Sequence, residues 1–223
     1  MKTAILIDGG YYRKVALPKF GFKSSKESAD ELYKYCTRHL TEGNKKNKFR
    51  NDLYRIFYYD CPPIEKNVYH PLLKKDIALG KTEHFNWMNE FIKELQKKRK
   101  LALRLGTISD ISLGYSLKPK VLKKLLSGDL TVSNLGENDF QFSALQKGVD
   151  MKIGVDIASI SYKKQVDQIV LIAGDSDFVP AAKLARREGV DFILDSLGRP
   201  VKNNLFEHID GLRFCDNRLK NDY

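Results

Sequence analysis

The chain has 223 residues, a length typical of one domain that can bury a core without disulfides or a structural metal. It carries 39 Lys and Arg against 28 Asp and Glu, a formal net charge of +11, which favours a polyanionic partner such as nucleic acid over a membrane surface, although such a surplus also serves solubility alone. The three cysteines form no Cys-x-x-Cys pair, which argues against a disulfide framework or a zinc knuckle. No apolar stretch approaches the ~20 residues of a membrane span, so we expect a soluble cytoplasmic protein.

Strands and helices alternate in the N-terminal half of the chain. The predicted strands are residues 4–7, 53–59 and 101–107, and the predicted helices are residues 25–40 and 85–95. The first strand is apolar throughout, which is typical of a strand buried on both faces of a parallel sheet. Arg55 and Arg104 place the other two strands nearer an edge or give them one wetter face. Each helix carries one apolar stripe, most simply a core face.

Residues from about 62 to 136 do not fit a minimal strand-helix-strand repeat. They hold Pro62-Pro63, Pro71, Pro119 and most of the dense lysine runs. We interpret part of this region as an insertion or an elaborated crossover within a single domain that spans residues 1–223.

The alternation resumes in the C-terminal part of the chain. A helix is predicted over 150–162, a buried strand over 169–173, a second helix over 179–188 and a further buried strand over 190–194. Pro180 falls in the first turn of the second helix, where its missing N–H removes no hydrogen bond, and Gly189 is a natural stop. The pattern as a whole predicts an α/β fold with a central, mainly parallel sheet.

Two of the apolar strands end in acidic residues. Asp8 follows residues 4–7, and Asp175 and Asp177 follow residues 169–173. If these strands are neighbours, their acids converge at the carboxyl edge of the sheet, where open α/β sheets bind ligands. Asp150, at the start of the preceding helix, is a fourth candidate. Asp156 is a less favoured additional acid, because it lies on a different side of that helix.

Carboxylates crowded in this way repel one another unless a cation lies between them. Oxygen ligands without clustered His or Cys favour Mg²⁺ or Mn²⁺ over Zn²⁺. One or two such ions would suit the attack of water on a phosphodiester. Each acid also has a structural alternative: Asp8 in a strand-to-helix turn, Asp150 as an N-cap, and Asp177 as the cap of the following helix.

Three sequence blocks resemble the NYN domain, a branch of the PIN-like nuclease superfamily, and within it the bacterial LabA-like group. They are Ile5-Leu-Ile-Asp-Gly-Gly10, Lys147-Gly-Val-Asp150 with the helix that follows, and Ala173-Gly-Asp-Ser-Asp-Phe-Val-Pro180. Phe57-Tyr58-Tyr59-Asp60 is similar to the aromatic-rich second strand of that group. Many NYN proteins carry Asn three residues after the first Asp, a position occupied here by Tyr11.

The resemblance implies a PIN-like, Rossmannoid three-layer α/β/α sandwich and a metal-dependent ribonuclease. In this interpretation the acidic residues of the family, which bind the metal and carry catalysis, correspond to Asp8, Asp150, Asp175 and Asp177.

Several neighbours of these acids are candidate substrate contacts. Tyr11 and Tyr12 can stack on unpaired bases, and Arg13 can meet a phosphate, although the tyrosines can equally pack beneath the first helix. Lys147 is a candidate bridge to an acid or a phosphate, with a solvated lysine as the alternative. Ser176 is a candidate hydrogen-bond donor or simply a small turn residue.

The leading hypothesis is a Mg²⁺- or Mn²⁺-dependent ribonuclease acting on single-stranded or structured RNA, with DNA as an open second substrate. The alternative is a non-catalytic RNA-binding or protein-scaffolding module. A phosphatase or nucleotide hydrolase with Asp8 as nucleophile ranks third, because that class usually has a second acid where Gly10 stands. The sequence leaves the oligomeric state open.

Overall fold

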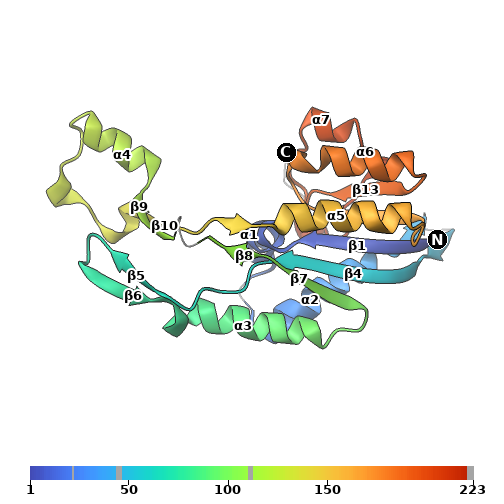
Figure 1. Ribbon diagram of the computed structural model, residues 1–223, viewed down its shortest axis with the longest axis horizontal. Helices are drawn as coiled ribbons and strands as arrows, with labels where there is room; N and C mark the ends of the chain where they lie inside the picture. Colours follow the sequence, from blue (N-terminus) through green and yellow to red (C-terminus); the bar gives the residue numbers. More distant parts are fainter. Residues whose placement is uncertain (22, 44–46, 110–112, 220–223) are drawn as a thin grey trace. The chain divides into compact units, whose positions relative to one another are not determined.

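The structure, a computed structural model, describes residues 1–21, 23–43, 47–109 and 113–219 (Figure 1). The chain forms two compact units. The first consists of Met1–Cys61, Glu90–Gly106 and Gly148–Tyr223, and the second of Pro62–Asn89 and Thr107–Lys147. The second unit begins where the insertion is predicted, but residues 90–106 belong to the first unit. Within the described ranges, no helix is both long and apolar enough to cross a membrane.

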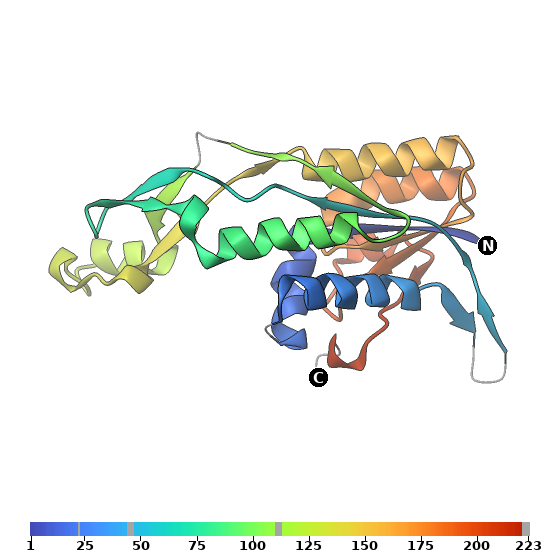
Figure 2. The ribbon, with the colours of Figure 1, turned by 90° about the horizontal axis from the view of Figure 1, so that it is seen from below.

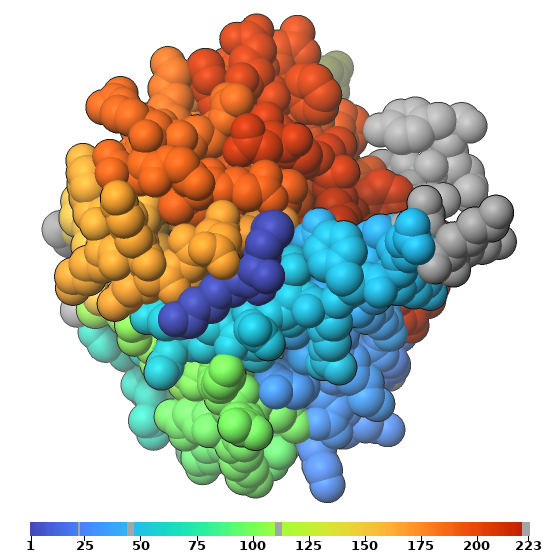
Figure 3. All heavy atoms as spheres, turned by 90° about the vertical axis from the view of Figure 1, so that its right-hand side faces the viewer, coloured from blue at the N-terminus to red at the C-terminus, as the bar shows by residue number. Residues whose placement is uncertain are grey.

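The first unit is built on a six-stranded sheet with the strand order β14-β13-β12-β1-β4-β7. Every neighbouring pair is parallel, which confirms the predicted parallel α/β sheet. The strands are β1 (Lys2–Asp8), β4 (Asp52–Asp60), β7 (Leu101–Leu105), β12 (Gln168–Ile172), β13 (Asp191–Asp195) and β14 (Gly211–Leu212). They begin at the edge of the sheet that faces the viewer in Figure 3, where the N-terminus borders the first residues of β4.

Helices cover both faces of this sheet. They are α1 (Gly9–Phe20), α2 (Ser25–Arg38), α3 (Glu83–Gln96), α5 (Val149–Tyr162), α6 (Val179–Arg187) and α7 (Asn203–Phe206). Figures 1 and 2 show α5 and α6 side by side on one face and α1 and α2 on the other. The first unit is therefore a three-layer α/β/α sandwich, as predicted. A hairpin of β2 (Thr41–Gly43) and β3 (Lys48–Arg50) follows α2.

The two central strands are buried because their side chains meet helices on both faces. Residues 4–7 of β1 and 169–172 of β12 are fully buried, in agreement with their uniformly apolar sequence. β7 forms one edge of the sheet and is half-buried throughout, as Arg104 indicated. β4 is different, because the half that follows Arg55 is buried in the interior of the sheet.

The second unit consists mainly of short antiparallel strand pairs. These pairs are β5 (Asn67–His70) with β6 (Lys75–Ala78), β8 (Thr107–Ile108) with β11 (Gln146–Lys147), and β9 (Gly114–Leu117) with β10 (Phe140–Ser143). Aromatic rings join two of the pairs, since His70 lies against both Tyr115 and Phe140. The unit also contains helix α4 (Pro119–Leu126), which has no buried residue. Short 3-10 helices complete the chain: η1 (Leu79–Lys81), η3 (Val132–Asn134), η4 (Glu137–Asp139), η5 (Ser176–Phe178) and η6 (Asn217–Leu219).

Candidate functional site

Acidic residues line the carboxyl edge of the parallel sheet. Asp8, Asp60 and Asp195 are the last residues of β1, β4 and β13, and Asp175 follows the end of β12 by three residues. Because the strands are parallel neighbours, with Ile7 in register with Ile172, their ends lie along one edge. The structure thus brings the predicted acids of β1 and β12 to the same side of the sheet.

Asp8 caps helix α1 and is partly withdrawn from solvent. Its Oδ1 accepts a hydrogen bond from the Tyr11 backbone N–H at 3.0 Å, so the structural alternative of a turn residue also describes it. Burial raises the pKa of Asp8 to about 6 against the opposing effect of the Tyr11 hydrogen bond, and the negative charges of Asp150 and Asp60 raise it further. The carboxylate therefore lies in a strongly negative environment.

Asp150 connects this environment to the acids that follow β12. It is the second residue of α5, whose N-cap is Gly148, so Asp150 is not itself the cap. Partial burial of its carboxylate, and then the negative charges of Asp175 and Asp177, raise the pKa of Asp150. Its charge acts in turn on Asp8. Asp150 therefore interacts electrostatically with each of the three other predicted acids.

Asp175 and Asp177 form an exposed acidic turn between β12 and α6. Asp175 Oδ1 accepts a hydrogen bond from the Asp177 backbone N–H at 3.1 Å and caps the short helix η5. The N-cap of α6 is Phe178, so Asp177 does not have the capping role that sequence alone offered as its alternative. Its carboxylate stays exposed at the end of the sheet.

These carboxylates have the chemistry that a hard divalent cation requires. All four donors are oxygens, and the pKa values of Asp8 and Asp150 are raised in part by neighbouring negative charge, which a cation would relieve. Among the residues described, no three His, Cys, Asp or Glu side chains are gathered into a group that could hold a metal ion as they stand. The donor set fits Mg²⁺ or Mn²⁺ by ligand type.

The additional candidate, Asp156, has other partners. Its Oδ2 accepts hydrogen bonds from the Tyr59 hydroxyl at 2.8 Å and from Arg104 Nε at 2.9 Å. These contacts hold it between α5 and the face of β4 and β7. The charges that act on Asp8 and Asp150 do not include Asp156.

Asp60 is a site residue that sequence analysis did not single out. It is fully buried, and Arg13 donates to both of its oxygens at 2.9 and 2.7 Å. The Tyr58 hydroxyl and the Cys61 backbone N–H donate to it at 2.7 and 2.8 Å. The available signal was the strand itself, since Phe57-Tyr58-Tyr59-Asp60 ends in an acid just as β1 does.

Asp195 is a second buried acid at this edge. It accepts hydrogen bonds from the Tyr35 hydroxyl and, at 2.7 Å, from the Leu197 backbone N–H, and it pairs with His39 Nε2 at 2.9 Å. Both Asp195 and His39 are fully buried. The strand that precedes Asp195 is apolar, which again repeats the pattern of β1. Local partners therefore satisfy Asp60 and Asp195, whereas Asp175 and Asp177 face solvent.

The two tyrosines after Asp8 have different environments. The Tyr11 ring packs on Gly174, where an added Cβ would lie 2.3 Å from Tyr11 Cε2, and its hydroxyl donates to the Ser196 carbonyl at 2.6 Å. Burial, with the charges of Asp195 and Asp8, raises the pKa of Tyr11 to about 12. Tyr12 is fully buried, with its ring near those of Phe20 and Tyr35, which removes it from the candidate substrate contacts.

Arg13, Lys147 and Ser176 also differ from one another in what they can contact. The bidentate ion pair with Asp60 occupies the Arg13 guanidinium, which leaves little of it to meet a phosphate. Lys147 is exposed on β11 and belongs to the second unit. Ser176 is half-buried in the acidic turn, where its Oγ accepts a hydrogen bond from Lys202 Nζ at 3.3 Å.

Two cations after β13 were not among the candidates from sequence. Lys202 reaches the acidic turn through Ser176. The positive charge of Arg199 lowers the pKa of Tyr11, although burial raises it more strongly. This influence indicates that the Arg199 guanidinium lies near the same edge. Both residues are exposed and come from the loop that follows Asp195. The carboxyl edge thus offers exposed positive charge beside exposed carboxylates.

Comparison with known proteins identifies part of this arrangement. Residues 115–206 match the family model of the NYN domain. This range contains Asp150, Asp175 and Asp177 but not Asp8. The match confirms the predicted resemblance to the NYN domain over these residues. No curated protein matches the chain with significant sequence similarity.

Two solved structures resemble the chain at low identity. A protein of unknown function from Vibrio parahaemolyticus is 12% identical over 97% of this chain and 94% of that one, with a TM-score of 0.46. A structure described for the mechanism and regulation of Sir2 enzymes is 9% identical over 98% of this chain and 87% of that one, with a TM-score of 0.34. Neither likeness is close enough to bear on function.

Proposed function

We propose that this protein, of which residues 115–206 match the NYN domain of the PIN-like nuclease superfamily, is a Mg²⁺- or Mn²⁺-dependent ribonuclease. The observation that carries the proposal is the electrostatic link between Asp150 and the three other carboxylates at one edge of the parallel sheet. Burial and then the charges of Asp175 and Asp177 raise the pKa of Asp150, and the charge of Asp150 adds to the burial that raises the pKa of Asp8, a costly arrangement that is typical of a site for cations.

These four residues would hold the ion through their carboxylate oxygens. A bound Mg²⁺ or Mn²⁺ supplies a water of lowered pKa and neutralises the charge that develops on the phosphate. Backbone hydrogen bonds hold Asp8 and Asp175 in place before any ligand arrives. Such preorganisation reduces the cost of gathering like charges at the moment of reaction.

The surrounding residues support the same chemistry. Arg13 compensates the charge of Asp60, which limits the repulsion between this buried carboxylate and Asp8. Lys202 and Arg199 are exposed near the acidic edge and would contact the phosphate of the substrate. Hydrolysis consumes one water: a bond between phosphorus and a ribose oxygen breaks, and the fragments end in a phosphate and a hydroxyl.

The test is cleavage of labelled single-stranded RNA by purified protein with Mn²⁺, with Mg²⁺ and with EDTA. The variants are Asp8→Asn, Asp150→Asn and Asp175→Asn. The matched control is Asp52→Asn, an exposed acid at the opposite end of β4. We expect metal-dependent cleavage by the wild type and the control, and loss of at least ~100-fold in each site variant, as when a group that stabilises the transition state is removed.

Other outcomes would reject the proposal in different ways. Equal cleavage by all variants would identify a contaminating nuclease. Salt-sensitive RNA binding by a wild type that does not cleave would support a non-catalytic RNA-binding module. Activity on small phosphate esters without RNA cleavage would support a phosphatase. A parallel reaction with single-stranded DNA measures the preference for RNA.

A further inference from the structure

Helix α6 presents three cations to solvent on the side away from the sheet. Lys183, Arg186 and Arg187 are exposed, whereas Ala182 and Ala185 are buried in the core. The helix has no acidic residue. A helix needs only its apolar residues to pack on a sheet, so the fold does not require this concentration of positive charge.

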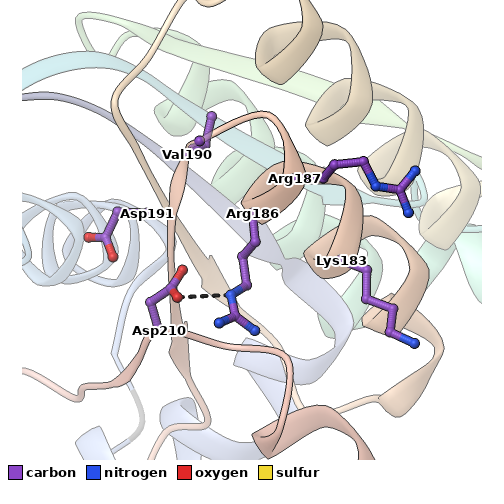
Figure 4. A pocket seen from close by; sticks show the side chains of 7 residues that line it. Lys183, Arg186, Arg187, Val190, Asp191 and Asp210 are labelled. Carbon is purple, nitrogen blue, oxygen red and sulfur yellow. Dashed lines mark hydrogen bonds and ion pairs between the residues drawn. The ribbon is translucent and has the colours of Figure 1, made fainter.

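The cations border a hollow of about 540 Å³ in the surface (Figure 4). Its other lining residues are Gly189, Val190, Asp191 and Asp210. Both acids in the lining already have partners. Asp210 accepts hydrogen bonds from Arg186 Nε at 2.8 Å and from the Phe192 backbone N–H at 2.9 Å, and Asp191 accepts one from Gln168 Nε2 at 2.7 Å.

Lys183 and Arg187 are left without compensation. Within the described residues, neither side chain has an ion pair or a hydrogen bond to an acid. Figure 4 shows both side chains extending away from Asp210, whereas Arg186 points toward it. They are four residues apart and therefore adjacent on the surface of the helix. The hollow consequently has a net positive wall that faces solvent.

Helix α6 connects the acidic turn, at the carboxyl edge of the sheet, with this wall, at the opposite edge where β13 begins at Asp191. The helix begins at Val179, two residues after Asp177, and leads away from the acidic turn. At ~1.5 Å per residue, Lys183 lies about 6 Å and Arg187 about 12 Å along the helix axis from Val179, the first residue of α6. A strand that follows the helix from the acidic turn would therefore reach both cations within a few nucleotides.

We propose that Lys183 and Arg187 bind the backbone phosphates of RNA that flank the bond cleaved at the acidic edge. This inference rests on the proposed function, since it takes the substrate to be a polynucleotide that enters the acidic site. The contacts are made to phosphate, so they add affinity without sequence preference. They act only on RNA long enough to reach from the acidic turn to the end of α6.

The experiment measures RNA binding separately from cleavage. The double variant Lys183→Ala/Arg187→Ala is made in the Asp8→Asn background, and the affinity for a fluorescent single-stranded RNA is measured by anisotropy in EDTA over a range of salt. The control is Lys93→Ala/Lys97→Ala, which removes two exposed cations at the same spacing, Lys93 in the last turn of α3 and Lys97, paired with Glu94, in the turn that follows. Alanine suits a helix, so both doubles should fold.

The expected losses follow from counterion release. Each phosphate contact on a single strand contributes a salt slope of ~0.7, or about 5-fold in affinity at 0.1 M salt. The α6 variant should therefore bind about 25-fold more weakly, with a salt slope smaller by about 1.4, while the α3 control binds like its parent. In the cleaving protein, the α6 variant should raise KM for long RNA and leave the cleavage of very short RNA unchanged.

The outcomes separate this inference from the proposed function. Unchanged binding by the α6 variant, or equal losses in the α6 and α3 variants, would overturn the inference while metal-dependent cleavage still stands. A selective loss of binding in the α6 variant, with no cleavage by the wild type, would support the RNA contact and reject the nuclease. An equal loss on single-stranded DNA would support contact with the backbone phosphates.

Discussion

Replacement of Gly9 by Ala should destabilise the acidic edge of the sheet from within. Gly9 is the first residue of α1 and follows Asp8 directly. A Cβ at this position would lie 2.5 Å from both Cζ and the hydroxyl oxygen of Tyr58, and 2.7 Å from Asp60 Oδ2. Such distances are well inside van der Waals contact, so either the helix or its neighbours must move.

The obstructing atoms cannot move cheaply. Tyr58 and Asp60 are fully buried, and Asp60 is fixed by its two bonds to Arg13 and by the Tyr58 hydroxyl. Overpacking of a core costs about 1–3 kcal/mol, and loss of one hydrogen bond to a charged group costs about 1.5–3 kcal/mol. Alanine regains roughly 0.5–1 kcal/mol over glycine in a helix. The net expectation is a loss of about 1.5–5.5 kcal/mol in the free energy of unfolding.

Urea denaturation of Gly9→Ala and of a second variant, Gly154→Ala, measures this effect. Gly154 lies within α5, and apart from its chain neighbours and the backbone of its own helix, no heavy atom of the described residues lies within 4 Å of the position its Cβ would take. The same substitution there should stabilise the protein by about 0.5–1 kcal/mol. The reasoning fails if the two variants shift the unfolding midpoint in the same direction, or if Gly9→Ala changes stability by less than ~0.5 kcal/mol.

Three further predictions concern the charges at this edge. In metal-free protein, the pKa of Asp8 is raised to about 6, so the folded state binds this proton more tightly than the unfolded state does. The contribution of Asp8 to stability should therefore fall by up to ~3 kcal/mol as pH rises from about 4 to about 6. Asp8→Asn keeps the helix cap and should abolish this fall, which urea midpoints at pH 4 to 7 in EDTA would detect. Addition of Mn²⁺ at pH 7 should raise the unfolding temperature of the wild type, because an ion that binds only the folded state stabilises it, and should leave that of Asp8→Asn nearly unchanged. Equal increases in the two unfolding temperatures would place the ion elsewhere. Arg13→Met should lower the free energy of unfolding, measured by urea denaturation, by about 3–5 kcal/mol, because it leaves the buried Asp60 charge without a partner. The double variant Arg13→Met/Asp60→Leu should recover much of this loss. A small loss in the single variant would contradict a stabilising role of the buried ion pair.

Sequence reasoning succeeded where local pattern and structure coincide. Uniformly apolar strands can be buried only between two layers, so residues 4–7 and 169–173 predicted a parallel α/β sheet. Parallel neighbours end at one edge, which is why Asp8 and Asp175 could be expected on the same side. Helical periodicity located α2, α3, α5 and α6 to within about two residues.

The second unit shows one limit of this reasoning. Two of its three strand pairs join strands far apart in the sequence, as when Gln146 of β11 lies opposite Ile108 of β8. A strand of two residues carries no readable period, and its partner is fixed only when the chain has folded. The composition of this region indicated a departure from the repeat but not its strand pairing.

The apolar strand that ends in Asp occurs at Asp8, Asp60 and Asp195 alike, and sequence alone does not rank the three. The tertiary structure distinguishes them. Arg13 pairs with Asp60 and His39 contacts Asp195, whereas the charges that act on Asp8 are those of other acids. The same holds for Arg186, which Asp210 compensates. The sequence determined which charges exist and on which elements they lie. Only the fold decided which of them are neutralised, because electrostatic compensation acts over a few ångströms through space and joins residues that lie far apart along the chain.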